Sequence, residues 1–210
     1  MTWSDATLRE FQDALASSEP TPGGGSAAGV ALGQAAALAV MVSDLTLGKE
    51  TLRGGWEISE QVKRIALPIL EDGLKLATAD SEAFDKVVAS FKLPKDTDHL
   101  KSERRDAIRS ATLGAAEVPY LTAISALELL KLLPELAEKG NPNAASDVGV
   151  ASLLASTALK GGIFNVEINL QSLPDDYGVE MRNNLPKLIE NGRIYSRRAM
   201  DAVRDRLSNQ

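Results

Sequence analysis

The chain has 210 residues and a formal net charge of −6, from 23 basic and 29 acidic side chains. This length suits one domain with a substantial core, and the acidic balance argues against a nucleic-acid or anionic membrane surface as partner. The absence of cysteine excludes disulfides, thiol nucleophiles and cysteine-based metal sites. The single histidine, His99, lies in a polar turn sequence, so neither a catalytic triad nor a metal site is expected.

A short amphipathic helix is predicted over residues 5–15, and the most unusual stretch of the chain follows it. Thr21-Pro22-Gly23-Gly24-Gly25-Ser26 leads into an uncharged, proline-free segment, residues 27–42. Ser26 is a typical helix N-cap, which predicts a helix over residues 26–47. The glycines then have two interpretations: a tight turn into a closely packed helix, or a loop whose free amides bind an anion at the helix N-terminus.

The predicted central helix has two further features. Gly29 and Gly33 lie on one face, so a second helix backbone can approach closely there. The segment is short and rich in alanine and glycine for a membrane span, so we expect a core helix and no membrane. No signal-peptide pattern opens the chain, which leads us to expect a cytoplasmic protein.

The remaining segments also have helical periodicity. We predict a helix over residues 56–90 bent at Pro68, one over 98–132 kinked at Pro119, and a short one from Pro134 to Gly140. Two more cover residues 144–172 and 175–207. A strand over residues 163–170 is the main local alternative. The predicted fold is all-α, a single-domain bundle over residues 1–210 with long, partly kinked helices.

Asp80 breaks the pattern of its helix. It follows Ala77 by three residues and precedes Phe84 by four, so it lies against the predicted apolar stripe, next to Ser81. A partly buried carboxylate can have a raised pKa and act as an acid or base. It can equally bind the end of a neighbouring helix, and both interpretations stay open.

Three other polar groups are unusual. Four hydrogen-bonding residues cluster in 141–147, which capping explains only in part. Asn165 and Asn169 share one face of an apolar segment and can join helices or read the edge of a heterocycle. Lys49 follows the predicted C-cap Gly48 and can offer its charge to a carboxylate or oxyanion.

These features occur together in one known family. The ordered set resembles the cyclodeaminase/cyclohydrolase family, which includes methenyl-tetrahydrofolate cyclohydrolases and the C-terminal domain of formiminotransferase-cyclodeaminase. The resemblance covers roughly residues 7 to 175 and rests on the segments 22–26, 45–49, 80–84, 93–95, 118–119, 140–147 and 165–170. It implies an all-helical homodimer with a site near the subunit interface, acting on tetrahydrofolate, and it places the catalytic aspartate at Asp80.

The predicted reaction is hydrolysis of methenyl-tetrahydrofolate to formyl-tetrahydrofolate, with Asp80 accepting a proton from water and with no metal or cofactor beyond the folate. A formimino-tetrahydrofolate cyclodeaminase that releases ammonia is the alternative, and the absence of a transferase domain favours the cyclohydrolase. A non-catalytic folate-binding dimer is the third possibility, because Glu50-Thr51-Leu52 departs from the family pattern. The predicted catalytic residues are Asp80 and Lys49, and the predicted substrate-binding residues are Pro22, Gly23, Gly24, Gly25, Ser26, Asn141, Asn143, Ser146, Asp147 and Asn165.

Overall fold

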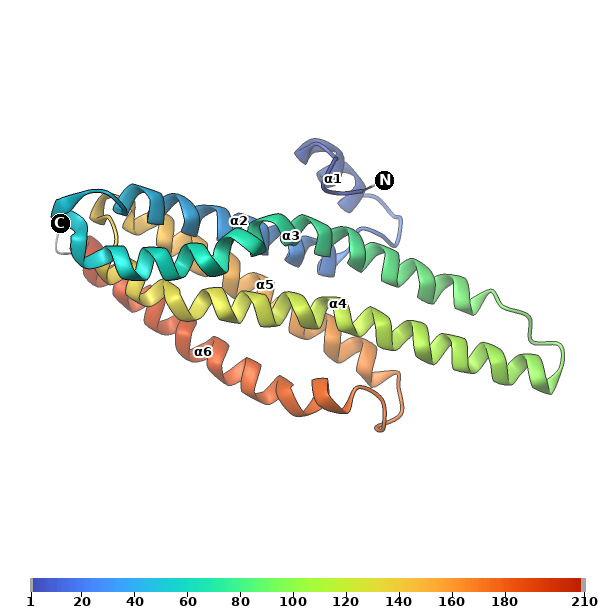
Figure 1. The fold of residues 1–210 in the computed structure, drawn as a ribbon. Coiled ribbons are helices and arrows are strands. Elements are labelled where there is room, and N and C mark those ends of the chain that lie inside the picture. The colour runs from blue at the N-terminus through green and yellow to red at the C-terminus, as the bar shows by residue number, and fades with distance from the viewer. Residues whose placement is uncertain (1, 209–210) are drawn as a thin grey trace.

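The computed structural model describes residues 2–208, and every regular element in that range is helical. Five long helices form an elongated bundle, a short N-terminal helix lies outside it on one side, and the α3–α4 hairpin extends beyond the start of α2 (Figure 1). The predicted all-α class is therefore confirmed, and helix rather than strand occupies residues 163–170. The elements are α1 (Leu8–Leu15), α2 (Gly24–Thr46), η1 (Glu50–Gly55), α3 (Trp56–Phe91), α4 (Asp98–Lys139), η2 (Pro142–Ala144), α5 (Ala145–Gln171) and α6 (Val179–Ser208).

The central helix α2 begins earlier than predicted. Gly23 is its N-cap and Gly24 its first residue, so the prediction that Ser26 caps the helix is wrong. The glycines have no side chains to oppose the helical turn, and the Ser26 hydroxyl, freed from capping, donates to Asp80 on α3 instead. At the other end Gly48 has a φ of 76°, the left-handed conformation expected after a helix C-terminus.

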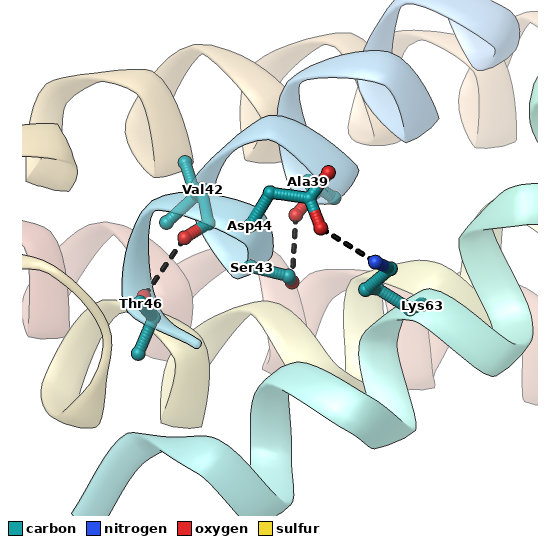
Figure 2. Close-up of polar contacts among 6 residues, drawn as sticks. All are labelled: Ala39, Val42, Ser43, Asp44, Thr46 and Lys63. Carbon is teal, nitrogen blue, oxygen red and sulfur yellow. Dashed lines mark hydrogen bonds and ion pairs between the residues drawn. The ribbon is translucent and has the colours of Figure 1, made fainter. Parts of the chain in front are cut away.

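Polar side chains near the end of α2 are satisfied within the bundle. Figure 2 shows the Ser43 and Thr46 hydroxyls donating to the carbonyls of Ala39 and Val42, both at 2.8 Å. Serine and threonine commonly bond back to the carbonyl four residues earlier, so these buried hydroxyls keep a partner. Thr46 also accepts from the backbone amide of Asn141 at 2.9 Å, which fixes the α4–α5 connection to the end of α2.

The backbones of α2 and α3 approach each other closely. A Cβ built on Gly73 of α3 would lie 2.7 Å from both the Cα and the backbone nitrogen of Gly33, and one on Gly29 would lie 2.8 Å from the Ala77 nitrogen. Only residues without a side chain allow two backbones this near to each other. The predicted close approach at Gly29 and Gly33 is therefore found, and α3 is the helix that makes it.

The buried face of α3 differs from the predicted stripe. Ala77 and Ser81 are buried as expected, but Phe84 and Phe91 are 40% and 54% exposed. The α3 core is instead made by smaller or earlier side chains: Ile58, Ser59, Val62, Ala66, Ile69, Gly73, Ala77, Ser81 and Ala83. Phe91 lies where α3 extends beyond α2, so periodicity alone did not reveal which part of the helix has a neighbour.

Two predicted helix boundaries are corrected. α4 runs without interruption through both Pro119 and Pro134, so the separate short helix predicted from Pro134 does not exist. Both prolines are buried, and packing against neighbouring helices holds α4 together despite the two missing hydrogen bonds. α6 starts at Val179 rather than at residue 175, because Gly178 has a φ of 64° and ends the preceding turn.

Three segments, Gly24–Thr46, Asp98–Lys139 and Pro142–Gln171, are long and apolar enough to cross a membrane by length and composition. In the fold they pack against one another and the other helices, and 50–56% of their most apolar windows is buried inside the protein. The contacts among α2, α4 and α5 are therefore part of the protein core. The expectation that α2 is a core helix is confirmed, and the expectation that it does not span a membrane stays a prediction.

The close contact at Gly73 predicts that one added methyl group there destabilises the protein. Gly73→Ala should lower the free energy of unfolding by about 1–3 kcal/mol, because the new Cβ meets the backbone of α2 and forces the helices apart. The measurement is chemical denaturation. Gly114→Ala in α4 is the matched control: its Cβ meets open space, so this change should stabilise the protein by about 0.5–1 kcal/mol. Equal effects of the two variants would contradict the prediction.

Candidate active site

Asp80 lies on α3 directly beside the first turn of α2. Its Oδ2 accepts a hydrogen bond from the Ser26 hydroxyl at 2.9 Å. Ser26 is fully buried, whereas Asp80 is partly exposed to a cleft. The first turn of a helix carries free amides and the positive end of the helix dipole, and both favour an anion there. Both interpretations of Asp80 from sequence are therefore compatible with its position: it binds a helix end, and it faces a cleft.

Opposing effects act on the charge of Asp80. Burial raises the pKa of the Asp80 carboxyl group above its ordinary value, and this effect exceeds the lowering by hydrogen bonds from the Ser26 hydroxyl and backbone amide. No basic side chain within residues 2–208 contributes to the shift. Asp80 is thus a largely buried carboxylate with hydrogen-bond donors but no neighbouring positive charge, an arrangement that often marks functional sites.

The absence of a side chain at Gly25 allows the Asp80 carboxylate to lie against the first turn of α2. A Cβ built at this position would lie 2.1 Å from Oδ1 of Asp80 and 2.6 Å from its Cγ. Any side chain would displace the carboxylate from the helix start. The last glycine of the three is therefore required by the close approach of Asp80, which the sequence alone did not reveal.

The cleft around Asp80 has a volume of about 200 Å³ and draws its walls from five parts of the chain. Asn165 and Asn169 on α5 face it, and each donates through Nδ2 to a backbone carbonyl, of Gly161 at 2.8 Å and of Ala115 at 2.9 Å. These bonds fix the orientation of both amides and leave their carbonyl oxygens as acceptors. The lining residues are Pro20, Thr21, Gly23, Gly24, Gly25, Asp80, Phe84, Ala115, Asn165, Ile168 and Asn169.

Sequence reasoning missed the apolar walls of this cleft. Phe84 and Ile168 are 40% and 62% exposed, and both line it. Phe84 was assigned to the core because its spacing matches an apolar stripe, and that spacing does not distinguish a core residue from a cleft wall. Pro22, predicted as a binding residue, is buried and is not among the lining residues.

The other predicted site residues lie at the opposite end of α2. This helix has 23 residues, which makes it about 35 Å long, and Lys49 follows its C-terminal end. Asn141 is bound to the same end, since its Nδ2 donates to the Leu45 carbonyl at 3.1 Å. Within one chain, the structure therefore does not bring Lys49 to Asp80, and the shared pocket expected from the sequence is not formed.

The 141–147 segment has both capping and exposed groups. Asn141 is buried, and its Oδ1 accepts from the backbone amide of Asn143 at 3.1 Å, so it serves the turn itself. Asn143 and Ser146 are exposed and Asp147 is half-buried. Neither Asn143 nor Ser146 makes a side-chain cap at the start of α5, so capping does not account for these two residues. These exposed groups and Lys49 all lie at the far end of α2 from Asp80.

Two alternatives, a cavity at the N-terminal segment and a metal centre, are less suited to chemistry. A larger cavity of about 300 Å³ lies between the N-terminal segment, α2 and α3, and no ionisable side chain lines it within the described chain. No group of three or more histidine, aspartate or glutamate side chains in residues 2–208 is placed to hold a metal ion. The Asp80 cleft is therefore the candidate active site.

The fold and this cleft define an all-helical domain with a buried carboxylate at a glycine-rich helix start, and the chain as a whole is similar to known proteins. A family model described as formiminotransferase-cyclodeaminase matches residues 7–185. A methenyltetrahydrofolate cyclohydrolase from Methylorubrum extorquens is 36% identical over 210 aligned residues, which cover 96% of this chain and 98% of that protein. The formimidoyltransferase-cyclodeaminase of Rattus norvegicus is 32% identical over 89% of this chain, which spans 35% of that relative.

A solved structure agrees with the sequence relatives. The crystal structure of formiminotetrahydrofolate cyclodeaminase from Thermotoga maritima superposes with a TM-score of 0.80 and 29% identity, covering 98% of both chains. The chain belongs to the formiminotransferase-cyclodeaminase family, and the resemblance inferred from its motifs is confirmed.

The contact between Gly25 and Asp80 leads to a structural prediction. Gly25→Ala should break the Ser26–Asp80 hydrogen bond and lower the unfolding free energy by about 1–3 kcal/mol, because its Cβ occupies the position of the carboxylate. Crystallography and denaturation measure the two effects. Gly24→Ala is the control, since its Cβ would lie 3.7 Å from Asn165, an ordinary contact. An unmoved Asp80 in Gly25→Ala would contradict the prediction.

Proposed function

We propose that this protein hydrolyses methenyl-tetrahydrofolate to formyl-tetrahydrofolate, with Asp80 as the catalytic base. The observation that carries the proposal is the carboxylate without a positive partner. The methenyl group is a delocalised amidinium cation, and such a cation supplies the charge that Asp80 lacks. The family membership and the 36% identity to a methenyltetrahydrofolate cyclohydrolase support the same substrate class.

In the proposed mechanism, the carboxylate acts on both the cation and the water. Asp80 stabilises the bound amidinium and accepts a proton as the water oxygen attacks the methenyl carbon. The tetrahedral adduct then breaks one carbon–nitrogen bond. The departing nitrogen takes the proton from Asp80 and the hydroxyl of the adduct loses its proton to solvent, which leaves the formyl group on the other nitrogen. General-base assistance of this kind contributes about 10²–10⁴-fold.

The other lining groups have assigned roles in this proposal. The oriented carbonyl oxygens of Asn165 and Asn169 accept from donors on the pterin edge, and Phe84 and Ile168 offer apolar walls to a ring. Chemistry at an amidinium needs no redox change and no Lewis acid. We therefore propose that the folate substrate is the only small molecule involved, with no metal or further cofactor.

Cyclodeamination is the second candidate, favoured by a specific finding. The Thermotoga maritima protein with the same fold is a formiminotetrahydrofolate cyclodeaminase, and its likeness covers 98% of this chain. In that reaction a folate nitrogen attacks the formimino carbon and ammonia leaves, through a tetrahedral centre at the same carbon.

The third possibility, a non-catalytic folate binder, rests on the departure of residues 50–52 from the family pattern. These residues lie in η1, at the far end of α2 from Asp80.

We further propose that the protein is a homodimer and that two chains complete each site. A volume of about 200 Å³ is below the roughly 300–1,000 Å³ of typical ligand pockets, so one chain encloses too little of a folate. The outer faces of α5 and α2 are also apolar. Val150, Leu153, Phe164, Ile168 and Met41 are 39–66% exposed there, a surface suited to a second copy.

The position of this face gives Lys49 and residues 141–147 a role. Ser146 lies at the start of α5 and Ile168 near its end, on the same exposed stripe. A two-fold axis across α5 would place the start of one helix against the end of the other. We propose that Lys49, Asn143 and Ser146 of the second copy reach the Asp80 cleft, where the lysine can bind a folate carboxylate.

The proposed setting is cytoplasmic, without a membrane. Three helices have the length and apolar composition of membrane spans, but they are also the helices that form the core of the bundle. Folate chemistry with a water-soluble substrate needs no membrane, and the net charge of −6 disfavours anionic lipid or nucleic acid as partner.

Asp80→Asn tests the proposed reaction. The absorbance decay of methenyl-tetrahydrofolate should slow by about 10²–10⁴-fold, because the amide accepts no proton from water. Ammonia release from formimino-tetrahydrofolate, measured in parallel, separates the second candidate from the first. Glu82→Gln is the matched control, an exposed carboxylate two residues along the same helix. An Asp80→Asn variant as active as the parent sinks the assignment.

The raised pKa of Asp80 also predicts how the stability of the Asp80→Asn variant depends on pH. Because burial raises the pKa of Asp80, the folded state retains a proton that the unfolded state has lost, and stability falls as pH rises through that interval. At neutral pH the ionised carboxylate is therefore a cost that Asp80→Asn removes. Its Tm at pH 7 should equal or exceed that of the parent, with the difference shrinking toward pH 3.

Leu153→Glu tests the dimer. Leu153 is 55% exposed in the middle of the α5 face, so a charge there should prevent association. Sedimentation should show about twice the 22.3 kDa chain mass for the parent and a single chain for the variant, with turnover lost as well. Ile189→Glu on α6, at a residue 48% exposed, should change neither. A monomeric parent with full activity would contradict the proposal.

A further inference from the structure

The N-terminal segment, which precedes the family match at residue 7, is hydrogen-bonded to the neighbours of Asp80. The indole Nε1 of Trp3 donates to the Ser81 hydroxyl at 2.9 Å, and the Trp3 backbone nitrogen donates to the Thr78 hydroxyl at 2.8 Å. The Trp3 ring also meets Phe11 of α1 edge-on, with centroids 5.5 Å apart. Trp3 is therefore fixed to α3 on the turn that carries Asp80.

From Trp3 the hydrogen bonds continue to the carboxylate. The Ser81 and Ser26 hydroxyl oxygens are 3.0 Å apart, and Ser26 donates to Asp80 at 2.9 Å. Both serines are buried, at 7% and 0% exposure, so these bonds have no competition from bulk water. Three consecutive bonds thus join residues from the N-terminal segment, α3 and α2 to one carboxyl group.

The direction of these bonds follows from the chemistry of the groups. An indole N–H only donates, and an ionised carboxylate only accepts. Ser26 has one proton and gives it to Asp80, so Ser81 must donate to Ser26 and accept from Trp3. Donors aligned in one direction polarise one another, and each strengthens the next. The aligned chain favours the ionised form of Asp80.

We propose that Trp3 is a positioning residue for Asp80, acting through Ser81 and Ser26 to orient the carboxylate and to favour its ionised form. The indole N–H occupies the Ser81 oxygen, which directs the Ser81 proton to Ser26 and the Ser26 proton to Asp80. Without that donor, both serine hydroxyls are free to reverse. The role of Trp3 in turnover rests on the proposed function, whereas its effect on the proton of Asp80 does not.

No other ionisable group faces Asp80 in the described part of the chain. The cleft walls from the glycine loop, α2, α4 and α5 are Thr21, glycines, Ala115, Asn165, Ile168 and Asn169. On α3 itself Glu82 and Asp85 are exposed, and Asp85 accepts from the Thr21 hydroxyl at 3.2 Å. Altering Trp3 changes none of these groups, nor the Lys49 that we propose enters the cleft from the second copy. A change in the titration of Asp80 on altering Trp3 would therefore pass through the hydroxyls.

Carbon-13 NMR of protein labelled at aspartate carboxyl groups tests the proposal without turnover. The Asp80 signal is assigned by its loss in Asp80→Asn. Trp3→Phe keeps an aromatic ring against Phe11 but has no donor, and it should shift the Asp80 titration to higher pH. Ser81→Ala should shift it in the same direction and Ser26→Ala the furthest. Trp56→Phe is the control, because the buried Trp56 Nε1 has no hydrogen-bond partner among the described residues.

A double variant tests whether the effect passes through Ser26. Trp3→Phe should shift the Asp80 titration in the parent but not in Ser26→Ala, because coupled residues are not additive. An unchanged titration in Trp3→Phe, or an equal shift in both backgrounds, overturns the proposal. In the hydrolysis assay of Trp3→Phe, the acid limb of the pH–rate profile should shift together with the Asp80 titration seen by NMR. The rate of this variant should recover at higher pH. A purely structural role would lower the rate at every pH.

The two proposals fail separately. If Asp80→Asn remains active, the catalytic assignment is wrong while the NMR shifts still measure the bond chain. If Asp80→Asn is inactive and Trp3→Phe titrates like the parent, only the role of Trp3 is lost. Melting curves of Trp3→Phe and Ser81→Ala establish that the folded proteins are compared.

Discussion

The contact between the backbones of α2 and α3 is the constraint on which the rest of the structure depends. Gly29 and Gly33 meet Gly73 and Ala77 at distances that leave no room for side chains. Two helices this close bring the first turn of α2 against the α3 turn that carries Asp80. The close packing therefore explains why the site exists here, since a wider separation would move the carboxylate away from Gly25 and Ser26.

The same arrangement places the carboxylate between opposing effects. Burial disfavours its charge, while the Ser26 hydroxyl, the Ser26 amide and the helix dipole favour it. No basic side chain of the described residues adds its charge to this balance. A core built only for stability would neutralise or replace such a group, and residues that carry an energetic cost are common where a ligand supplies the missing interaction.

Sequence patterns predicted the local features of the site better than its assembly. Asp80, the glycine loop and Asn165 were each identified by residue type, and they meet because α2 packs against both α3 and α5. Lys49 was assigned to the same pocket, yet the 23 residues of α2 separate it from Asp80. Spacing along a chain indicates which face of a helix a residue occupies, but not which end of the bundle holds it. Phe84 shows a related limit, because an apolar residue at core spacing lines the cleft instead.

Ser26 connects the local sequence pattern to the packing of the helices. As a serine after glycines it has the pattern of a helix cap, but the helix starts at Gly24 and leaves its hydroxyl inside the first turn. There it has one proton to give and two lone pairs to receive with, so it can join Asp80 to a further donor. Ser81 fills that position, and Trp3 is bonded to Ser81 in turn. The proton on Asp80 thus depends on Trp3, Ser26 and Ser81, side chains 23 to 78 positions apart in sequence. They become neighbours because both α2 and the N-terminal segment pack on α3.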